Sequence, residues 1–225
     1  MLISPSNSDV VSRAENSLRS TQVWAWDFLP RIPALVLLIL ACPWMILLAS
    51  LVALVSRRAP FVMHRRVGWQ GRDLWLLKIR TMWEDSPEPS AQCCGWFVER
   101  LQESWVPDKT NGNPVVRHPL ACWLRRYSVD EIPQLLHVVG GAMALVGPRP
   151  LTREELRLHY GRFIPEVLSV KPGITGLWQI RGRNRLTYRK RLRYDLFLVR
   201  NRSLPLLVKI IWNTIPVVFR GENAW

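Results

Sequence analysis

The sequence predicts an α+β, mainly helical protein, in which a membrane helix interrupted by a proline precedes a small domain with a β-hairpin and amphipathic helices. Three observations support this prediction. Residues 32–55 contain no charge, two alternating apolar stretches flank a glycine-containing turn near residue 70, and the last third joins basic residues to apolar residues at helical spacing. Composition then limits the class of partner.

The composition favours a protein that meets an anionic membrane surface. A chain of 225 residues can bury one substantial core with an appended element. Its 31 Lys and Arg outnumber 17 acids, and a net charge of +14 indicates anionic partners. Because 48% of the residues are hydrophobic and twelve are Trp, lipid is favoured over nucleic acid, for which no recognition motif is present. The cysteines and histidines lack metal-ligand spacing, so a reducing cytoplasmic location is expected.

The N-terminal quarter is predicted to hold a flexible tail and a membrane segment. Residues 1–22 are mostly polar, rich in serine and without periodicity. As a helix, the 24 uncharged residues would measure about 36 Å, enough to cross a hydrocarbon core of about 30 Å. A signal peptide is less favoured, because the run is long and starts late. Pro43 bends or breaks helices, so the segment either spans with a kink or enters and returns on the same side.

A β-hairpin is predicted after Arg58, with its turn at Gly68 to Gly71. Strand alternation separates apolar residues from two cations, which either bind a partner or are simply solvated. The apolar face holds Trp75, Leu77 and Ile79, and the other face holds Lys78 and Arg80. Residues 84–118 are predicted to form a loop with one short helix around Trp96 to Glu103.

An amphipathic helix is predicted over residues 128–139, ending at two glycines. Ser128 and Glu131 have the spacing of a capping box, which would place Asp130 in the first turn. Pro133 fits this register poorly, so the helix could begin two or three residues later. Either start leaves the two acids at a helix N-terminus, where the dipole favours ionised carboxylates.

The C-terminal third is the most basic part of the chain. Eleven Lys or Arg and one acid lie between Leu177 and Gly221. Residues 203–220 are mostly apolar and predict either a buried helix or one that lies at a membrane interface. The basic flank favours the interface.

The surroundings of the acid pair indicate phosphoryl chemistry rather than simple helix capping. Arg125 and Arg126 precede the pair, and the turn Gly147 to Pro150 follows it with a guanidinium suited to gripping phosphate oxygens. The turns at 171–173 and 182–184 repeat the pattern of a cation beside a turn. Such a site suggests that one carboxylate attacks phosphorus while the other helps to hold Mg²⁺.

Three stretches carry a resemblance to a known family: HRRVGWQGRDLWLLKIRTM, LRRYSVDEIPQLLHVVGGAMALVGPRP and VKPGITGLWQIRGRN. They resemble the motifs of the bacterial sugar transferases, small monotopic polyprenyl-phosphate phosphoglycosyl transferases, from about residue 34 to the C-terminal end. The resemblance implies transfer of a sugar 1-phosphate from a UDP-sugar to polyprenyl (undecaprenyl) phosphate with release of UMP, which begins lipid-linked glycan synthesis. It also implies binding to inner-membrane lipids at the cytoplasmic face of the bacterial inner membrane.

The resemblance assigns roles to individual residues. Asp130 would be the nucleophile that takes the phosphosugar, and Glu131 would hold the Mg²⁺. Pro43 would make a re-entrant helix hairpin of residues 23–58 with both ends cytoplasmic, followed by a cytoplasmic catalytic domain of residues 59–225. The resemblance places Arg125 and Arg149 at substrate phosphates. The hairpin cations and the turns beside cations complete the set of expected phosphate-binding residues with Lys78, Arg80, Gly147, Pro148, Lys171 and Arg183.

The sequence departs from the family pattern at four places. Cys42 stands where a Ser usually precedes the helix-breaking proline, and Leu207 stands where the late helix usually has an Asp. GGAMALVG lacks an Asp and a Ser that are usual there, and NPVVRHP replaces a DPRIT-like segment. None of these changes touches the acid pair or the arginines.

Overall fold

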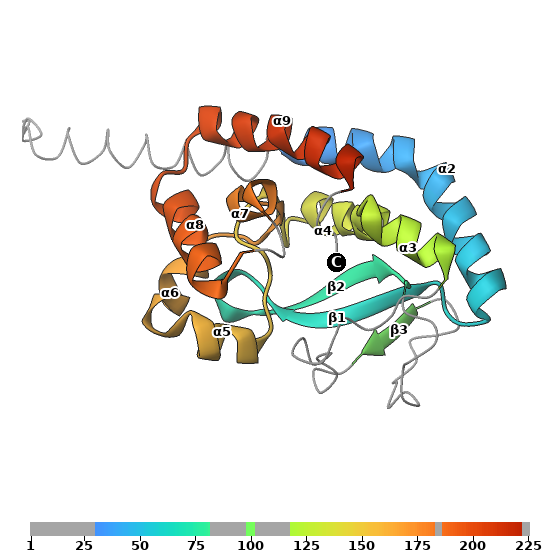
Figure 1. Ribbon diagram of the computed structural model, residues 1–225, viewed down its shortest axis with the longest axis horizontal. Coiled ribbons are helices and arrows are strands. Elements are labelled where there is room, and N and C mark those ends of the chain that lie inside the picture. The colour runs from blue at the N-terminus through green and yellow to red at the C-terminus, as the bar shows by residue number, and fades with distance from the viewer. Residues whose placement is uncertain (1–29, 82–97, 102–117, 183–185, 222–225) are drawn as a thin grey trace, which may run out of the picture.

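The computed structural model describes residues 30–81, 98–101, 118–182 and 186–221 (Figure 1). The predicted tail, residues 1–22, lies outside these ranges. The described part is mostly helical with a small sheet, as the sequence predicts. Its first element in the chain is a long apolar helix.

The long apolar helix, α2, spans Arg31–Ser56 and contains Pro43. Figure 1 shows α2 bent: one part lies beside α9 and the other descends toward β1. Pro43 lacks the N–H that would continue the hydrogen-bond ladder, which is a known cause of such bends. Within the described ranges, α2 is the one helix long and apolar enough to cross a membrane. Only Ala34, Ala49 and Val52 of α2 are buried, and most of its apolar surface is not covered by the described residues.

The predicted hairpin is confirmed. Strands β1 (Phe61–Val67) and β2 (Asp73–Ile79) pair antiparallel around a 3₁₀ turn, η1 (Trp69–Gly71). The third strand, β3 (Val98–Leu101), pairs parallel with β1, so the sheet order is β2-β1-β3. The short helix predicted around this segment is therefore wrong, because its backbone satisfies the open edge of β1 instead.

The hairpin face that carries Lys78 is a packed face. Lys78 lies opposite Val62 in the register, two residues after Leu76 on the same side of the strand. Leu74 and Leu76 are buried in a cluster with Ala34 of α2 and Val138. Of the two sequence-based alternatives, the solvated face is excluded for Lys78, which points toward protein.

The chain between the hairpin and the C-terminus forms short helices and a second, two-stranded parallel sheet. In order, these elements are α3 (Pro119–Arg126), η2 (Val129–Gln134), α4 (Leu135–Val139), β4 (Ala144–Val146), α5 (Arg153–His159), η3 (Gly161–Phe163), α6 (Ile164–Val167), β5 (Gly173–Thr175), α7 (Leu177–Arg181), α8 (Tyr188–Arg200) and α9 (Leu204–Arg220). Element η2 packs against both β2 and α2.

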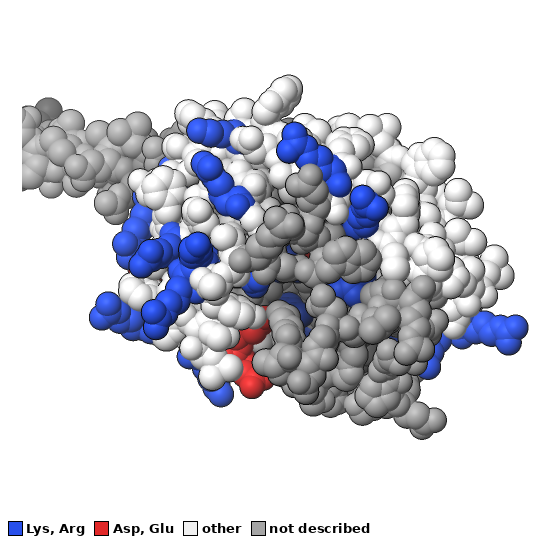
Figure 2. All heavy atoms as spheres, in the orientation of Figure 1, with Lys and Arg blue, Asp and Glu red and all other residues white. Residues whose placement is uncertain are grey.

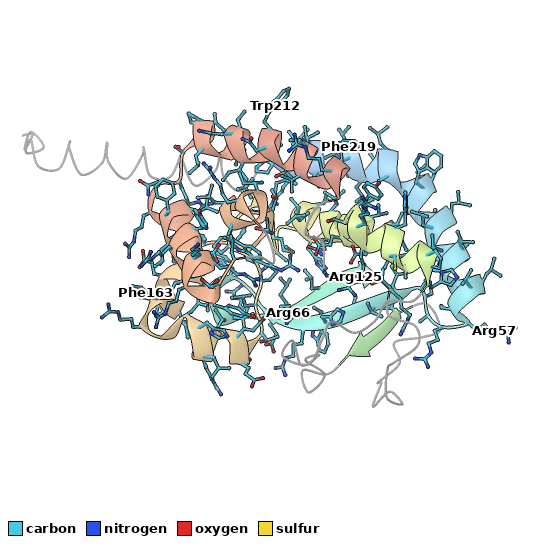
Figure 3. All side chains as sticks on the ribbon, in the orientation of Figure 1. Arg57, Arg66, Arg125, Phe163, Trp212 and Phe219 are labelled. Atoms are coloured by element: carbon cyan, nitrogen blue, oxygen red, sulfur yellow. The ribbon has the colours of Figure 1, made fainter. Side chains whose placement is uncertain are left out.

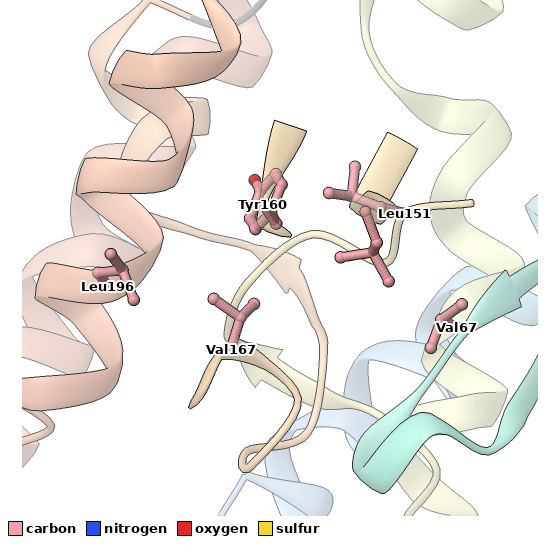
Figure 4. Packing of buried hydrophobic residues seen from close by; sticks show 6 residues of the cluster. Val67, Leu151, Tyr160, Val167 and Leu196 are labelled. Atoms are coloured by element: carbon pink, nitrogen blue, oxygen red, sulfur yellow. The ribbon is translucent and has the colours of Figure 1, made fainter. Parts of the chain in front are cut away.

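One hydrophobic cluster joins the hairpin to the helices on its far side (Figure 4). Burial of such side chains is the main stabilising term in folding. Its buried members are Val67, Leu151, Leu156, Tyr160, Val167 and Leu196. This cluster fixes α5, α6 and α8 around the end of β1.

Helix α9 is apolar on two faces. Leu207 and Ile210 are buried in a cluster with Val146 of β4, so a leucine fits the position where the family pattern has an Asp. The opposite face is exposed, and Figure 3 shows Trp212 projecting away from the domain. The exposed apolar residues of α9 are Leu204, Val208, Trp212, Ile215 and Phe219. The buried-helix alternative describes one face of α9, and placement of the exposed face at a membrane interface stays a prediction.

Candidate active site

The acid pair lies in a 3₁₀ turn and not in the predicted α-helix. Element η2 ends at Gln134, α4 begins at Leu135, and Pro133 lies inside η2. Ser128 has a left-handed backbone, with φ of 56°, and its side chain does not cap the turn. The predicted capping box is wrong, and the side chain of Glu131 is directed elsewhere.

Glu131 forms ion pairs with two cations from distant parts of the chain. Its Oε1 accepts from Nζ of Lys78 at 2.8 Å and from Nη2 of Arg149 at 3.4 Å. The side chains of Lys78 and Glu131 are 17% and 19% exposed, so water screens this pair only in part. Lys78 and Arg149, both predicted to bind substrate phosphates, therefore lie beside the acid pair, and phosphate binding by them stays a prediction.

Asp130 is buried, with 9% of its surface exposed. Burial raises the pKa of its carboxyl from 3.8 to about 6. The charge of Lys78 lowers this pKa and the charge of Glu131 raises it; Arg125 and Arg149 lower it further. Asp130 therefore holds a poorly solvated carboxylate near neutral pH, surrounded by three cations.

Arg125 lies in the last turn of α3, four residues before Val129 of η2. It is half-buried, and Figure 3 places it between the helices and the β1–β2 hairpin. Its positive charge lowers the pKa of the Asp130 carboxyl.

Two of the predicted phosphate-binding turns are held against each other. Strands β4 and β5 pair in parallel, the Gly147 N–H donates to the Thr175 carbonyl at 3.0 Å, and the Gly173 N–H donates to the Pro148 carbonyl at 2.9 Å. A Cβ added to Gly147 would meet the Lys171 carbonyl oxygen at 2.5 Å, so a glycine is required for this approach. The turns containing Arg149 and Lys171 are therefore neighbours in space.

Two other predicted phosphate-binding side chains have structural contacts of their own. Nζ of Lys171 lies 5.6 Å from the centre of the Trp69 ring. Arg80 is 2% exposed, and its Nε donates to the Ala59 carbonyl at 2.7 Å. Phosphate binding by these two side chains remains a prediction. Arg183 lies outside the described residues.

The sequence analysis missed an aromatic centre beside Arg149. The guanidinium of Arg149 lies 5.9 Å from the centre of the Trp178 ring, and that of Arg191 lies 4.7 Å from it. Trp178 is 3% exposed. The sequence contains one signal for this contact, a tryptophan among glycine and cationic residues. Such a pattern fits equally well a tryptophan buried in the core and a tryptophan whose ring binds a cation.

The donor set suits a cation that takes most of its ligands from substrate and water. Within the described ranges, no group of three or more Asp, Glu, His or Cys residues could hold a metal ion. Two adjacent carboxylates are present, and Mg²⁺ in proteins often uses one or two carboxylates together with substrate phosphates. Asp130 and Glu131 offer carboxylate oxygens of the kind that Mg²⁺ takes, so the residues present fit this ion, and Glu131 stays its predicted ligand.

A profile of the bacterial sugar transferases matches residues 23–221. The chain belongs to the bacterial sugar transferase family. The exopolysaccharide production protein ExoY of Rhizobium meliloti is 37% identical over 192 residues, which cover 85% of this chain and 84% of ExoY. The UDP-galactose-lipid carrier transferase of Erwinia amylovora is 38% identical over 79% of this chain and 37% of that protein. The undecaprenyl-phosphate galactose phosphotransferase of Salmonella typhimurium is 35% identical over 85% of this chain and 40% of that protein.

The sequence-based assignment of this sugar transferase to its family is confirmed. The chain covers most of ExoY but less than half the length of the two galactose-related enzymes. Each match covers at least 79% of this chain, so each must include its central residues and with them η2 and both turns. Chemically, the arrangement offers one poorly solvated carboxylate, a second carboxylate paired with two cations, and guanidinium and ammonium groups of the kind that hold phosphate oxygens.

Proposed function

We propose that the protein transfers a sugar 1-phosphate from a UDP-sugar to undecaprenyl phosphate through a covalent phosphosugar on Asp130. One observation carries the proposal: the buried carboxyl of Asp130 lies next to Glu131, whose carboxylate contacts Lys78 and Arg149. The names of the relatives, which include a UDP-galactose-lipid carrier transferase and an undecaprenyl-phosphate phosphotransferase, support the choice of both substrates.

In the first step, a carboxylate oxygen of Asp130 attacks the phosphorus that bears the sugar. A bond forms between that oxygen and phosphorus, the bond to the bridging oxygen breaks, and its electron pair leaves with UMP. Arg125 and Arg149 neutralise charge on the phosphate oxygens, and partial burial keeps water from competing as the nucleophile. Poor solvation also leaves the Asp130 carboxylate more reactive than an exposed one.

In the second step, a phosphate oxygen of undecaprenyl phosphate attacks the same phosphorus. The Asp130–phosphorus bond breaks, its electron pair returns to the carboxylate, and the product is undecaprenyl diphosphosugar. When bound, Mg²⁺ would neutralise charge on the transferred phosphoryl group. Glu131 is its proposed ligand, and release of Glu131 would free Lys78 and Arg149 for substrate oxygens.

The test is exchange of labelled UMP into UDP-sugar by enzyme and Mg²⁺ without lipid acceptor. A covalent intermediate requires this exchange, which is the kinetic signature of a ping-pong route. Asp130→Asn should abolish exchange and turnover, because an amide cannot attack phosphorus. Glu131→Gln should weaken both, and excess Mg²⁺ should restore part of the rate. Exchange that requires undecaprenyl phosphate, or a phosphosugar mapped to another residue, would refute the covalent role of Asp130.

We also propose how the protein sits on the membrane. The bent α2 would enter the cytoplasmic leaflet of the bacterial inner membrane and return, and the exposed face of α9 would lie in the interface beside it. Exposed apolar side chains on both helices support this placement. Figure 2 adds that the surface over α2 is almost free of charge, whereas Lys and Arg gather over α8.

Topology can be tested with cysteines placed near each end of the chain. A re-entrant α2 puts residue 5 and residue 225 on the cytoplasmic side, so neither should react with an impermeant maleimide in intact cells. Both should react after the membrane is permeabilised. Labelling of residue 5 in intact cells would show that α2 spans the membrane.

A further inference from the structure

Arg191 differs from the other cations of α8. Arg189, Lys190 and Arg193 are exposed, whereas Arg191 is half-buried. Its guanidinium carbon lies 4.7 Å from the centre of the Trp178 ring and 4.9 Å from the centre of the Tyr188 ring. Cation–π contacts of this kind hold a guanidinium in place without using its N–H donors.

The two rings that hold Arg191 are themselves fixed. Tyr188 stacks on His159 with ring centres 3.7 Å apart, and its hydroxyl donates to Oε1 of Glu155 at 3.0 Å. Trp178 is buried, and its indole N–H has no hydrogen-bond partner among the described residues. The position of Trp178 is therefore set by packing and by the cations over its ring. Together these contacts give Arg191 a preformed orientation.

The hydrogen-bonding capacity of Arg191 is mostly unused. Its Nε donates to the Leu186 carbonyl at 3.1 Å, and no residue that the structure describes forms a hydrogen bond or ion pair with either of its Nη atoms. Asp195, one turn further along α8, is fully buried and accepts from the Tyr160 hydroxyl at 2.7 Å. Burial raises the pKa of Asp195 to about 7, so it carries less than a full charge near neutral pH and is a weak counter-ion for Arg191.

Arg191 also lies close to the active site. The guanidinium carbons of Arg191 and Arg149 lie 4.7 Å and 5.9 Å from the centre of the same ring, that of Trp178, so the two cations are neighbours. Arg149 in turn contacts Glu131 at 3.4 Å. A guanidinium whose Nη groups have no partner among the described residues can, at this distance, bind a second phosphate of a substrate whose first phosphate lies at Arg149.

We propose that Arg191, held by Trp178 and Tyr188, is a substrate-binding residue that grips a phosphate group beyond the one at Arg149. The proposal rests on the proposed function, because that reaction brings two phosphate-bearing substrates to one site. The phosphate could belong to the diphosphate of the UDP-sugar or to undecaprenyl phosphate. Both sources offer the same anionic oxygens, so the experiment must separate them.

Kinetics of Arg191→Gln provide the first test. In the donor arm, the KM for UDP-sugar is measured from UMP exchange without lipid. In the acceptor arm, the KM for undecaprenyl phosphate is measured at saturating UDP-sugar. Loss of a charge-assisted phosphate contact should raise the KM in one arm by about ten- to a hundredfold, and Arg191→Lys should restore part of the loss. Arg193→Gln, on the exposed side of the same helix, should leave both constants unchanged.

A KM unchanged in both arms would overturn the proposal. A loss confined to kcat together with a lower melting temperature would also overturn it, because that pattern indicates that Arg191 only holds Trp178 in place.

If Arg191→Gln does not fold, the wild-type protein gives the answer through phenylglyoxal modification mapped by mass spectrometry. UDP or a short polyprenyl phosphate should protect Arg191, and equal modification with and without them would reject the proposal. Wild-type protein that neither exchanges UMP nor transfers the phosphosugar would refute the proposed function itself. The protection experiment needs no turnover, so it tests phosphate binding at Arg191 independently of that result.

Discussion

Asp130→Asn should inactivate the enzyme and, at neutral pH, stabilise its fold. The carboxyl is 9% exposed, and its pKa is raised from 3.8 to about 6. A carboxyl whose pKa is raised in the folded state favours unfolding once the unfolded chain ionises. The cost therefore begins above pH 3.8, grows until about pH 6 and is constant beyond it. A neutral amide of the same shape avoids this cost.

The magnitude follows from the size of the shift. At about 1.4 kcal/mol per pKa unit, the full shift corresponds to about 3 kcal/mol, and sharing of charge with Glu131 reduces it to roughly 1 to 3 kcal/mol. For a chain of this size, each kcal/mol moves the melting temperature by about 2 to 4 °C. The expected gain at pH 7 is therefore a few degrees to about ten degrees.

The assay is thermal unfolding of the purified protein in detergent, without Mg²⁺ or substrate, at pH 7 and pH 4. Asp130→Asn should melt above the wild type at pH 7 and close to it at pH 4. Asp73→Asn is a matched control, because hydrogen bonds from Arg65 and Arg153 lower the pKa of Asp73 to about 2 and its replacement should destabilise. An Asp130→Asn protein that melts at or below the wild type at pH 7, or gains equally at both pH values, would refute the reasoning.

Four further outcomes are expected. UMP exchange should fall as the pH drops below about 6, because Asp130 must be ionised to attack; a flat rate from pH 7 to pH 5 would contradict this. Arg149→Ala should lower kcat/KM by about ten- to a hundredfold through loss of a charge-assisted contact, and wild-type kinetics would place it outside the site. Pro43→Leu should straighten α2 and expose residue 5 to impermeant maleimide in intact cells. A polarity-sensitive dye on Trp212→Cys should shift to the blue in vesicles; an unshifted emission would place α9 in water.

The hairpin could be predicted because its information is local. Alternating apolar residues and the Gly68 to Gly71 turn specify both strands and their register. Which face packs is decided elsewhere, by α2 and α4 arriving over Leu74 and Leu76, and alternation alone therefore left the direction of Lys78 open. Strand β3 was missed for the same reason, since four residues that pair parallel with β1 carry almost no pattern of their own.

The sequence predicted cations near the acid pair, but it could not predict the geometry of the contacts. The spacing of Ser128 and Glu131 satisfies a capping box, yet the left-handed backbone of Ser128 and the position of Pro133 produce a 3₁₀ turn. Glu131 then meets Lys78, which lies 53 residues away in the chain, and such a contact depends on the packing of η2 against β2. The contact of Trp178 with two arginines has the same origin in tertiary packing.

The close approach of Gly147 and Gly173 limits how the active site can be altered. A Cβ on Gly173 would stand 2.0 Å from the Gly147 nitrogen, so neither position can accept a side chain unless one backbone moves away from the other. The turns that carry Arg149 and Lys171 are thus packed backbone to backbone and joined by hydrogen bonds, so a shift in one turn displaces the other. Mutant libraries aimed at a new sugar preference should keep both glycines and vary side chains outside these two turns. Replacing either glycine would move the turns apart and displace Arg149.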